Sequence, residues 1–385
     1  MSNTEKTQDL RLYFAREPVI LVLLSGLAVL LFLGVAGLSR IYHAKQKSLG
    51  NEWFALGAAD LKDHRFELAA NEFRAALRYS RDDYSFQLSL AQALIGLKRT
   101  SEARAYLINL WEREPENGLV NLELARIAAQ TGETEQALRY YHNAIYSTWP
   151  GDQEVERRNA RLELIEYLLS INAKPQAQSE LIALAASLDD DPSLHERVGD
   201  LFLQAQDNEH ALAEYRLSLK SDRHNQAALA GAGLAAFELG RYPVAQRYLQ
   251  AATAANPGDV QTAERLRTTE LVVQMDPFRR QIPVEQRNRI VIQAFAAAGE
   301  QLKACSAAGG FKGHTSSSSP GQSLAENWAQ IEPQITERSL RKNPDLVEAA
   351  MDVVFAIERK ANDACGPLSG TDMALLLISK LHEGN

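Results

Sequence analysis

Cysteine is scarce in this sequence, and this scarcity excludes several kinds of protein. The 385 residues include two cysteines, Cys305 and Cys365, with no CxxC pair and no zinc-finger spacing. Two cysteines cannot form the dense disulfide framework of a small secreted domain. The fold must therefore be held together by buried apolar surface, with at most one disulfide in addition.

Basic residues are also fewer than acidic ones. The chain has 41 lysines and arginines against 49 aspartates and glutamates, which gives a formal net charge of -8. Affinity for nucleic acid rests mainly on lysine and arginine, so we expect no nucleic-acid partner. Apolar residues make up 45% of the chain and charged residues 23%, as in ordinary folded proteins.

Motifs for catalysis and metal binding are missing as well. The eight histidines are scattered and form no HExxH pattern. Residues 231–236 match the letters of a dinucleotide fingerprint, but they fall inside a predicted helix with no strand before it. Residues 366–370 resemble a nucleophile elbow only loosely, because no strand leads into them. The sequence therefore predicts no enzyme activity, no cofactor and no metal.

One long apolar run is present near the N-terminus. No charged residue occurs from Pro18 to Ser39, and the run from Val19 to Leu38 is apolar on every helical face. Twenty helical residues span about 30 Å, the hydrocarbon thickness of a bilayer. The sequence predicts a transmembrane helix at 18–39 after an N-terminal tail at 1–17. The alternative is a cleaved signal peptide, whose apolar region is usually shorter.

The charges that flank this run do not settle its orientation. Three basic residues precede it and three follow it closely, so the bias that sets topology is a tie. A short tail before the span and a large domain after it favour a single-pass protein with its domain on the exported, periplasmic side. A cysteine pair in that domain would agree with export.

Small residues recur with a period of 34 residues. The two series are Ala69, Ala103 and Ala137, then Ala177, Ala211 and Ala245. Four positions after each alanine stands a large apolar or aromatic residue: Phe73, Leu107, Tyr141, Leu181, Tyr215 and Leu249. This pattern predicts helices that approach closely at the alanine and fill the adjacent groove with the larger side chain.

The spacing resembles the tetratricopeptide repeat (TPR). The first repeat matches the family motif at Trp53, Leu56, Gly57, Ala69, Phe73 and Ala76, and prolines stand at the terminal position of repeats two and six, Pro115 and Pro257. The resemblance covers about 50–258 and implies an α-solenoid of about six repeats. Six extra residues at 147–152 separate repeats three and four, which puts the stacking there in doubt.

The 34-residue repeat pattern stops after residue 275. A helix from Asp259 to Met275 is expected to cover the end of the solenoid, which gives a repeat domain at 40–275. The region 276–385 resembles no family that we recognise, and it predicts helices at 284–304, 324–341, 344–364 and 371–381, with a flexible Gly/Ser loop at 309–321. The predicted fold is all-α: one N-terminal transmembrane helix, a TPR solenoid and a small helical C-terminal region.

The two cysteines fall at the ends of two of these predicted C-terminal helices. If Cys305 and Cys365 are bonded, closing a loop of about 60 residues stabilises the fold by about 4 kcal/mol in the chain-entropy model. The alternative is two buried free thiols, since free cysteine often behaves as a small apolar residue.

The resemblance also implies where partners bind. In this family the first helix of each repeat lines a concave face, and the positions that correspond here are Phe54, Leu88, Gln92, Leu122, Arg126, Glu166, Glu196, Asp200, Leu234 and Phe237. Repeats one to three are apolar there with one cation, and repeats four and five are acidic. The alternative is that these are ordinary exposed side chains.

Together these features predict a non-catalytic, membrane-anchored scaffold or assembly factor for a cell-envelope complex. Its partners would be proteins with a basic or amphipathic segment, and the bilayer would hold residues 18–39. One family subgroup clamps a C-terminal carboxylate with lysine, asparagine and arginine, and that set is absent here. Two alternatives stay open: a small ligand-binding or catalytic C-terminal domain that the repeats deliver, and a receptor that faces the cytosol.

Overall fold

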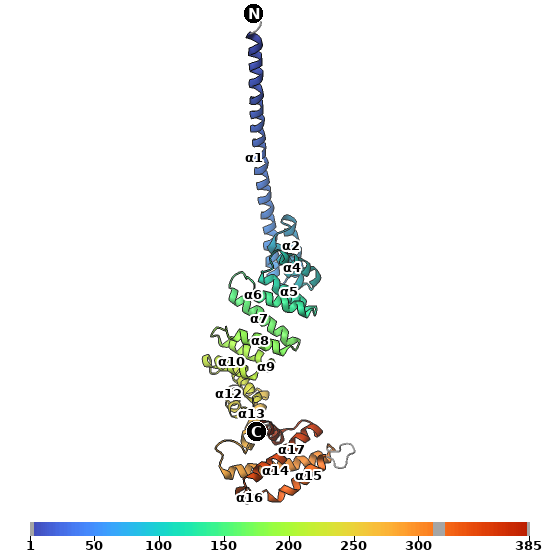
Figure 1. Ribbon diagram of the computed structural model, residues 1–385, viewed down its shortest axis with the longest axis vertical. Helices are drawn as coiled ribbons and strands as arrows, with labels where there is room; N and C mark the ends of the chain where they lie inside the picture. Colours follow the sequence, from blue (N-terminus) through green and yellow to red (C-terminus); the bar gives the residue numbers. More distant parts are fainter. Residues whose placement is uncertain (1–3, 311–319, 383–385) are drawn as a thin grey trace. The chain divides into compact units, whose positions relative to one another are not determined.

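The computed structural model describes residues 4–310 and 320–382 of the chain. Among these residues it has eighteen α-helices, one short 3-10 helix and no β-strand (Figure 1). The chain divides into two compact units between Leu164 and Ile165. The all-α prediction is confirmed.

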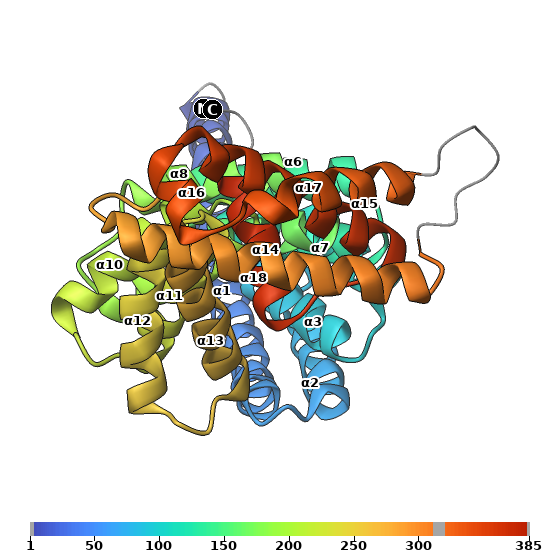
Figure 2. The same ribbon diagram turned by 90° about the horizontal axis from the view of Figure 1, so that it is seen from below.

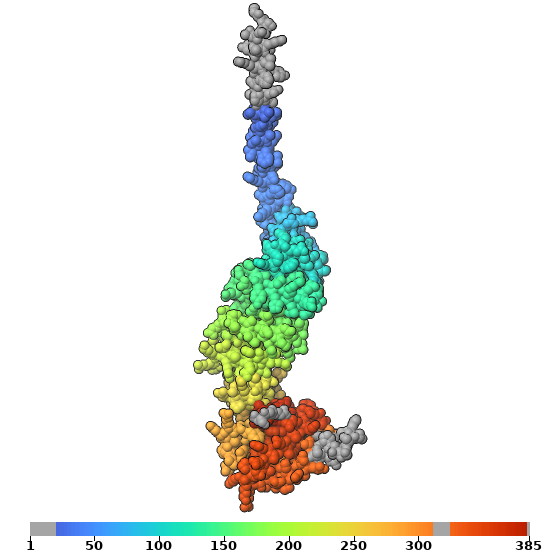
Figure 3. All heavy atoms as spheres, in the orientation of Figure 1, coloured from blue at the N-terminus to red at the C-terminus, as the bar shows by residue number. Residues whose placement is uncertain are grey.

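The first helix, α1 (Thr4–Lys62), joins the apolar run to the first repeat without a break. Its large apolar side chains from Leu21 to Leu38 are exposed (Figure 3). The helix is long and apolar enough to cross a membrane. No helix end falls at the predicted domain limit between residues 39 and 40, so that limit stays a prediction.

The first unit continues as antiparallel helix pairs. Its helices are α2 (Phe66–Tyr79), α3 (Tyr84–Gly96), α4 (Thr100–Arg113), α5 (Gly118–Gln130), α6 (Thr134–Tyr146) and the first part of α7 (Gln153–Ser170). The end of α1 pairs with α2, α3 with α4, and α5 with α6.

The six extra residues after α6 are held by a buried tryptophan. The Trp149 indole donates a hydrogen bond to the Ala144 carbonyl at 2.8 Å and packs on Gly118, where an added Cβ would lie 2.3 Å from the ring. The backbone of Thr148 also bonds to Glu116 and Gly118. The insertion is therefore folded back onto the third helix pair.

The second unit holds the end of α7 and the remaining repeats. These are α8 (Lys174–Ala185), α9 (Pro192–Gln204), α10 (Asn208–Ser221), α11 (Gln226–Glu238), α12 (Tyr242–Ala255) and α13 (Val260–Met275). As in the first unit, consecutive helices pair: α9 with α10, and α11 with α12.

The 34-residue register has a clear physical basis in the packing. All six repeat alanines are fully buried, and the six larger residues four positions later are buried as well. In three repeats the larger side chain lies against a glycine of the preceding helix, where an added Cβ would lie 2.6 to 2.9 Å from it: Phe73 on Gly57, Tyr215 on Gly199 and Leu249 on Gly233. The alanine and glycine positions therefore set how closely each helix pair packs.

The turn between the two helices of each repeat has the same backbone conformation. Five positions before each alanine, one residue has positive φ: His64, Lys98, Gly132, Asn172, Gln206 and Gly240, with φ from 59° to 76°. A left-handed residue at a helix C-terminus lets the chain reverse while the last carbonyls stay bonded. Only two of the six positions are glycine, so the other side chains adopt this conformation at a cost.

The C-terminal region packs on the last repeats. Its elements are α14 (Val284–Ala307), α15 (Pro320–Ile331), η1 (Glu332–Gln334), α16 (Glu337–Lys342), α17 (Asp345–Cys365) and α18 (Gly370–His382), which Figure 2 shows gathered together. One core contains residues of α14, α16, α17 and α18 together with Tyr242 of α12 and Val272 of α13. The end of the solenoid is therefore covered by more than the single helix predicted.

One predicted helix is wrong. The segment 324–341 is not continuous, since α15 ends at Ile331 and α16 begins at Glu337. Pro333 lies in the 3-10 turn between them, and its backbone nitrogen carries no hydrogen to donate to a helical hydrogen bond. Thr336 then starts α16 by accepting a hydrogen bond from the Ser339 N–H at 3.2 Å.

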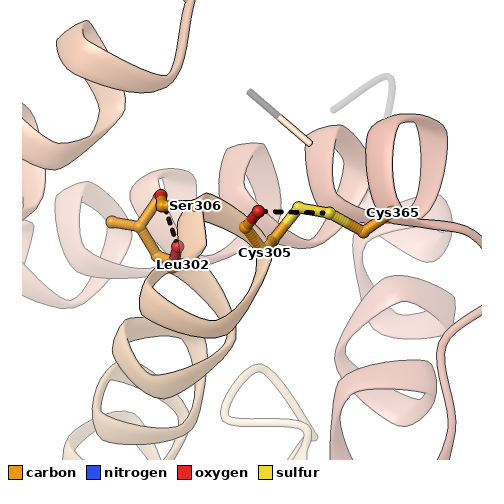
Figure 4. Close-up of a disulfide and its surroundings, with 4 residues drawn as sticks. All are labelled: Leu302, Cys305, Ser306 and Cys365. Carbon is orange, nitrogen blue, oxygen red and sulfur yellow. Dashed lines mark hydrogen bonds between the residues drawn. A yellow bond between two sulfur atoms is a disulfide. The ribbon is translucent and has the colours of Figure 1, made fainter. Parts of the chain in front are cut away.

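Cys305 and Cys365 are joined as a disulfide in the structure, as one of the two alternatives expects (Figure 4). Their Cα atoms are 5.8 Å apart, and the bond joins the end of α14 to the end of α17. Gly310 lies against both sulfurs, where an added Cβ would lie 2.1 Å from Cys365 Sγ. Residues 311–319 of the predicted Gly/Ser loop lie outside the described residues.

Candidate protein-binding surface

The positions that the resemblance assigns to partner binding all lie on the first helices of their pairs. In the first unit these are Phe54 on α1, Leu88 and Gln92 on α3, and Leu122 and Arg126 on α5. In the second unit they are Glu166 on α7, Glu196 and Asp200 on α9, and Leu234 and Phe237 on α11.

The apolar positions of the first unit contribute to its packing. Phe54 is half-buried, and its ring stacks on Phe86 with centroids 5.0 Å apart and lies 5.6 Å from Phe73. Leu88 is half-buried, and Leu122 is 4% exposed. Of these three side chains, Phe54 and Leu88 keep surface that a partner could contact.

The single cation, Arg126, is already paired. Its Nε and Nη2 donate to both carboxylate oxygens of Glu163 at 2.9 and 2.5 Å, and its Nη1 donates to Glu123 at 3.1 Å. Gln92 contacts the Glu123 carboxylate as well. Burial raises the pKa of Glu123, and Arg126 and Gln92 oppose that rise. The group links α3, α5 and α7, and its two carboxylates outnumber its one guanidinium.

The acidic positions of the second unit are partly neutralised. Glu166 forms an ion pair with Arg197 at 2.7 Å, with both side chains about half exposed. Glu196 accepts a hydrogen bond from the Asn225 side chain at 2.5 Å, and Asp200 accepts one from the Tyr215 hydroxyl. Asp200 is nevertheless exposed, and of the three carboxylates only Glu166 has an ion pair within the described residues, with Arg197. The surface is therefore acidic, but less so than the sequence predicts.

The two apolar positions on α11 differ in their surroundings. Leu234 is half-buried. Phe237 packs edge-on against Tyr242 at 5.4 Å, lies 5.8 Å beneath the Arg265 guanidinium and contacts the C-terminal core. Phe237 therefore supports the join between the last repeat and the C-terminal helices.

The C-terminal region has a cavity of its own, of about 350 Å³. It lies between the segment before α14 and the start of α17, and its charged lining residues are Arg279, Arg287, Asp345 and Glu348. The Arg287 Nε is buried without a hydrogen-bond partner. Within the described ranges, no group of three or more histidine, cysteine, aspartate or glutamate side chains could hold a metal ion.

The geometry described so far defines a helical repeat protein, with antiparallel pairs that share one register. A family model for the tetratricopeptide repeat matches residues 54–111, 99–153 and 230–266. The chain therefore contains tetratricopeptide repeats within 54–153 and 230–266, and stacked repeats of this kind present extended binding surfaces. A comparison with curated protein sequences finds no match.

Three solved structures resemble this chain at low sequence identity. YrrB, described as a TPR protein with an unusual peptide-binding site, is 14% identical over 50% of this chain and 97% of its own, with a TM-score of 0.40. PilF of Pseudomonas aeruginosa is 17% identical over 57% and 97%, with a TM-score of 0.41. PilW, a type IV pilus biogenesis factor, is 15% identical over 57% and 98%, with a TM-score of 0.40.

Proposed function

We propose that this chain is a non-catalytic scaffold, anchored in a membrane by its first helix, that assembles the components of a cell-envelope complex. The observation that supports this proposal best is the continuity of α1 from the apolar run to Lys62. A helix without a break between the span and the first repeat holds the repeats at a set height above the bilayer. At about 1.5 Å per residue, Gly50 lies about 18 Å beyond Leu38.

The partner that fits the second unit has a basic or amphipathic segment. The carboxylates of Glu166, Glu196 and Asp200 on the first helices would attract a basic segment during encounter, since complementary charge speeds association. Half-buried apolar positions such as Leu234 would add contact area. The disulfide supports a location on the exported side, because disulfides persist in oxidising compartments.

Crosslinking in intact cells tests this proposal. The affinity-tagged full-length chain is crosslinked, and the trapped proteins are identified by mass spectrometry. Recovery of one defined set of membrane or exported proteins is expected. Glu196→Lys with Asp200→Lys should lose that set, whereas Asp190→Lys, an exposed charge reversal in the loop before α9, should keep it. Equal recovery from wild type and both variants would contradict the acidic surface as the binding site.

The predicted side of the membrane has a separate test. Protein taken from its native compartment is alkylated without reductant, and Cys305 and Cys365 are mapped by mass spectrometry. Two unmodified cysteines would support export. Two alkylated cysteines would remove that support and favour the receptor that faces the cytosol.

A second candidate function is that the C-terminal region binds a small ligand. The cavity of about 350 Å³, with arginine and carboxylate side chains on its lining, favours this candidate. Free amino acids carry the matching pair of charges, so they are suitable probes for a thermal-shift assay of the full chain. A stabilisation that Arg287→Gln abolishes would support it, and no shift with any amino acid would oppose it.

A further inference from the structure

We infer that the second helices of the first two pairs form another binding site, for an extended acidic segment of a partner protein. A cavity of about 580 Å³ lies between α2 and α4, bounded also by the α2–α3 turn and the start of α3. That volume is typical of ligand sites. The lining residues used below are Arg74, Leu77, Arg78, Arg81, Gln87 and Tyr106. All belong to the first unit, and none is among the predicted inner-face positions.

The cavity is basic in an acidic protein. Three arginines and one acidic residue, Asp82, line it, whereas the whole chain has a net charge of -8. The Arg74 guanidinium forms an ion pair with the Glu102 carboxylate, with Nη2 and Oε2 3.6 Å apart. Arg78 and Arg81 are exposed, and within the described part of the chain their side chains make no hydrogen bond or ion pair. Two guanidinium groups are thus free to bind carboxylates, which they do with paired hydrogen bonds.

A buried amide beside the cavity lacks one of its partners. Gln87 is 8% exposed, and its Nε2 donates to the Arg81 carbonyl at 2.9 Å, which holds the α2–α3 turn in place. Its Oε1 is buried and has no hydrogen-bond partner. Buried acceptors of this kind are normally satisfied.

The spacing of the arginines fits an extended chain. Arg74 and Arg78 are one helical turn apart, about 6 Å along α2. Side chains two residues apart on an extended peptide lie on the same side, about 6.6 Å apart. A segment with acidic residues at alternate positions therefore places successive carboxylates over successive arginines. Leu77 and Tyr106 add apolar contact beside them.

The position of the cavity argues against a membrane surface as the occupant. The end of α2 lies beside Gly50, where an added Cβ would be 3.4 Å from Tyr79. If the apolar run spans the bilayer, that level is about 18 Å from the end of the run. An anionic lipid surface would not reach the arginines at that distance, whereas a soluble peptide would.

Peptide binding to the full-length chain in detergent tests the inference. Fluorescence anisotropy compares a labelled peptide of alternating glutamate and alanine with the same peptide carrying glutamine in place of glutamate. We expect the glutamate peptide to bind more tightly at low salt, and Arg78→Gln with Arg81→Gln to weaken its binding about tenfold or more. Arg216→Gln, an exposed arginine on α10, should leave binding unchanged.

Three outcomes would overturn the site: equal binding of the two peptides, unchanged binding by the double variant, or complete displacement of the peptide by inorganic phosphate at matched ionic strength. Both arginines are exposed, so the double variant should fold, and circular dichroism checks this. The site is independent of the acidic inner surface. Glu196→Lys with Asp200→Lys should leave peptide binding intact, so failure of one proposal does not decide the other.

Discussion

Glu358 is an acidic residue whose carboxyl group is buried without a hydrogen-bond partner. It lies on α17 and is fully buried, and neither carboxylate oxygen has a hydrogen-bond partner. Burial, with a smaller contribution from the nearby Asp372, raises the pKa of Glu358 to about 8. We therefore predict that Glu358→Gln removes a specific pH dependence from the stability of the second unit.

The sign and size of this effect follow from the two protonation states. The pKa of Glu358 is 4.5 in its unperturbed state and about 8 when folded. Between these values the folded protein keeps the proton and the unfolded chain has lost it, so each unit of rising pH lowers the free energy of unfolding by about 1.4 kcal/mol. Below the lower value and above the higher one, this contribution is constant.

We predict that the difference in free energy of unfolding between wild type and Glu358→Gln widens as pH rises. Between about pH 5.5 and about pH 7.5, wild type should lose about 2.7 kcal/mol relative to Glu358→Gln. For a unit of this size, that corresponds to roughly 5–11 °C in the difference between their Tm values. Thermal unfolding followed by circular dichroism in detergent measures it.

Two further variants make the result specific. Asp352→Asn changes an exposed acid on the same helix. Its stability should therefore follow that of wild type across this pH range, with no widening difference. Asp372→Asn removes the neighbouring negative charge, so the pKa of Glu358 should fall and the change of slope should move to lower pH. A gap between wild type and Glu358→Gln that stays constant across this pH range would refute the reasoning.

Three other predictions follow from the packing. Lys98→Gly should raise the free energy of unfolding by about 1 kcal/mol, measured by urea denaturation, because glycine adopts the positive φ of this turn without strain. Reduction of the bond between Cys305 and Cys365 should lower stability by about 4 kcal/mol, and a double serine variant should not respond to reductant. Arg126→Met should destabilise the first unit by about 3 kcal/mol, because Glu123 is then buried without its cation. Adding Glu123→Gln should recover much of that loss, which a double-mutant cycle measures.

Local pattern was enough to predict the repeats. The 34-residue spacing of alanine and a larger apolar residue depends on helices adjacent in sequence, which pack in the same way in every pair. The apolar run that begins α1 is likewise a property of consecutive residues. The left-handed turns had no such signal, since residues as different as His64, Lys98 and Gly132 occupy the same position.

The sequence predicted on which helices the candidate binding residues lie, but not which side chains contact them. The sequence marked Arg126 as the one cation of repeats one to three, and the structure shows that Glu163 from the next repeat binds it with two hydrogen bonds. The side chains around Phe237 come from α12 and α13, and from the C-terminal helices. These neighbours depend on how consecutive pairs stack, which the repeat register alone does not specify.

The sequence by itself determined the helical repeats, the long apolar helix and the acidic balance, because each rests on residues close together in the chain. The tertiary structure decided what meets across longer separations: the bond between Cys305 and Cys365, the burial of the Glu358 carboxyl group, and the arginine cavity between α2 and α4. Those features need side chains from different helices to meet, and helix packing sets their positions only after the pairs have stacked.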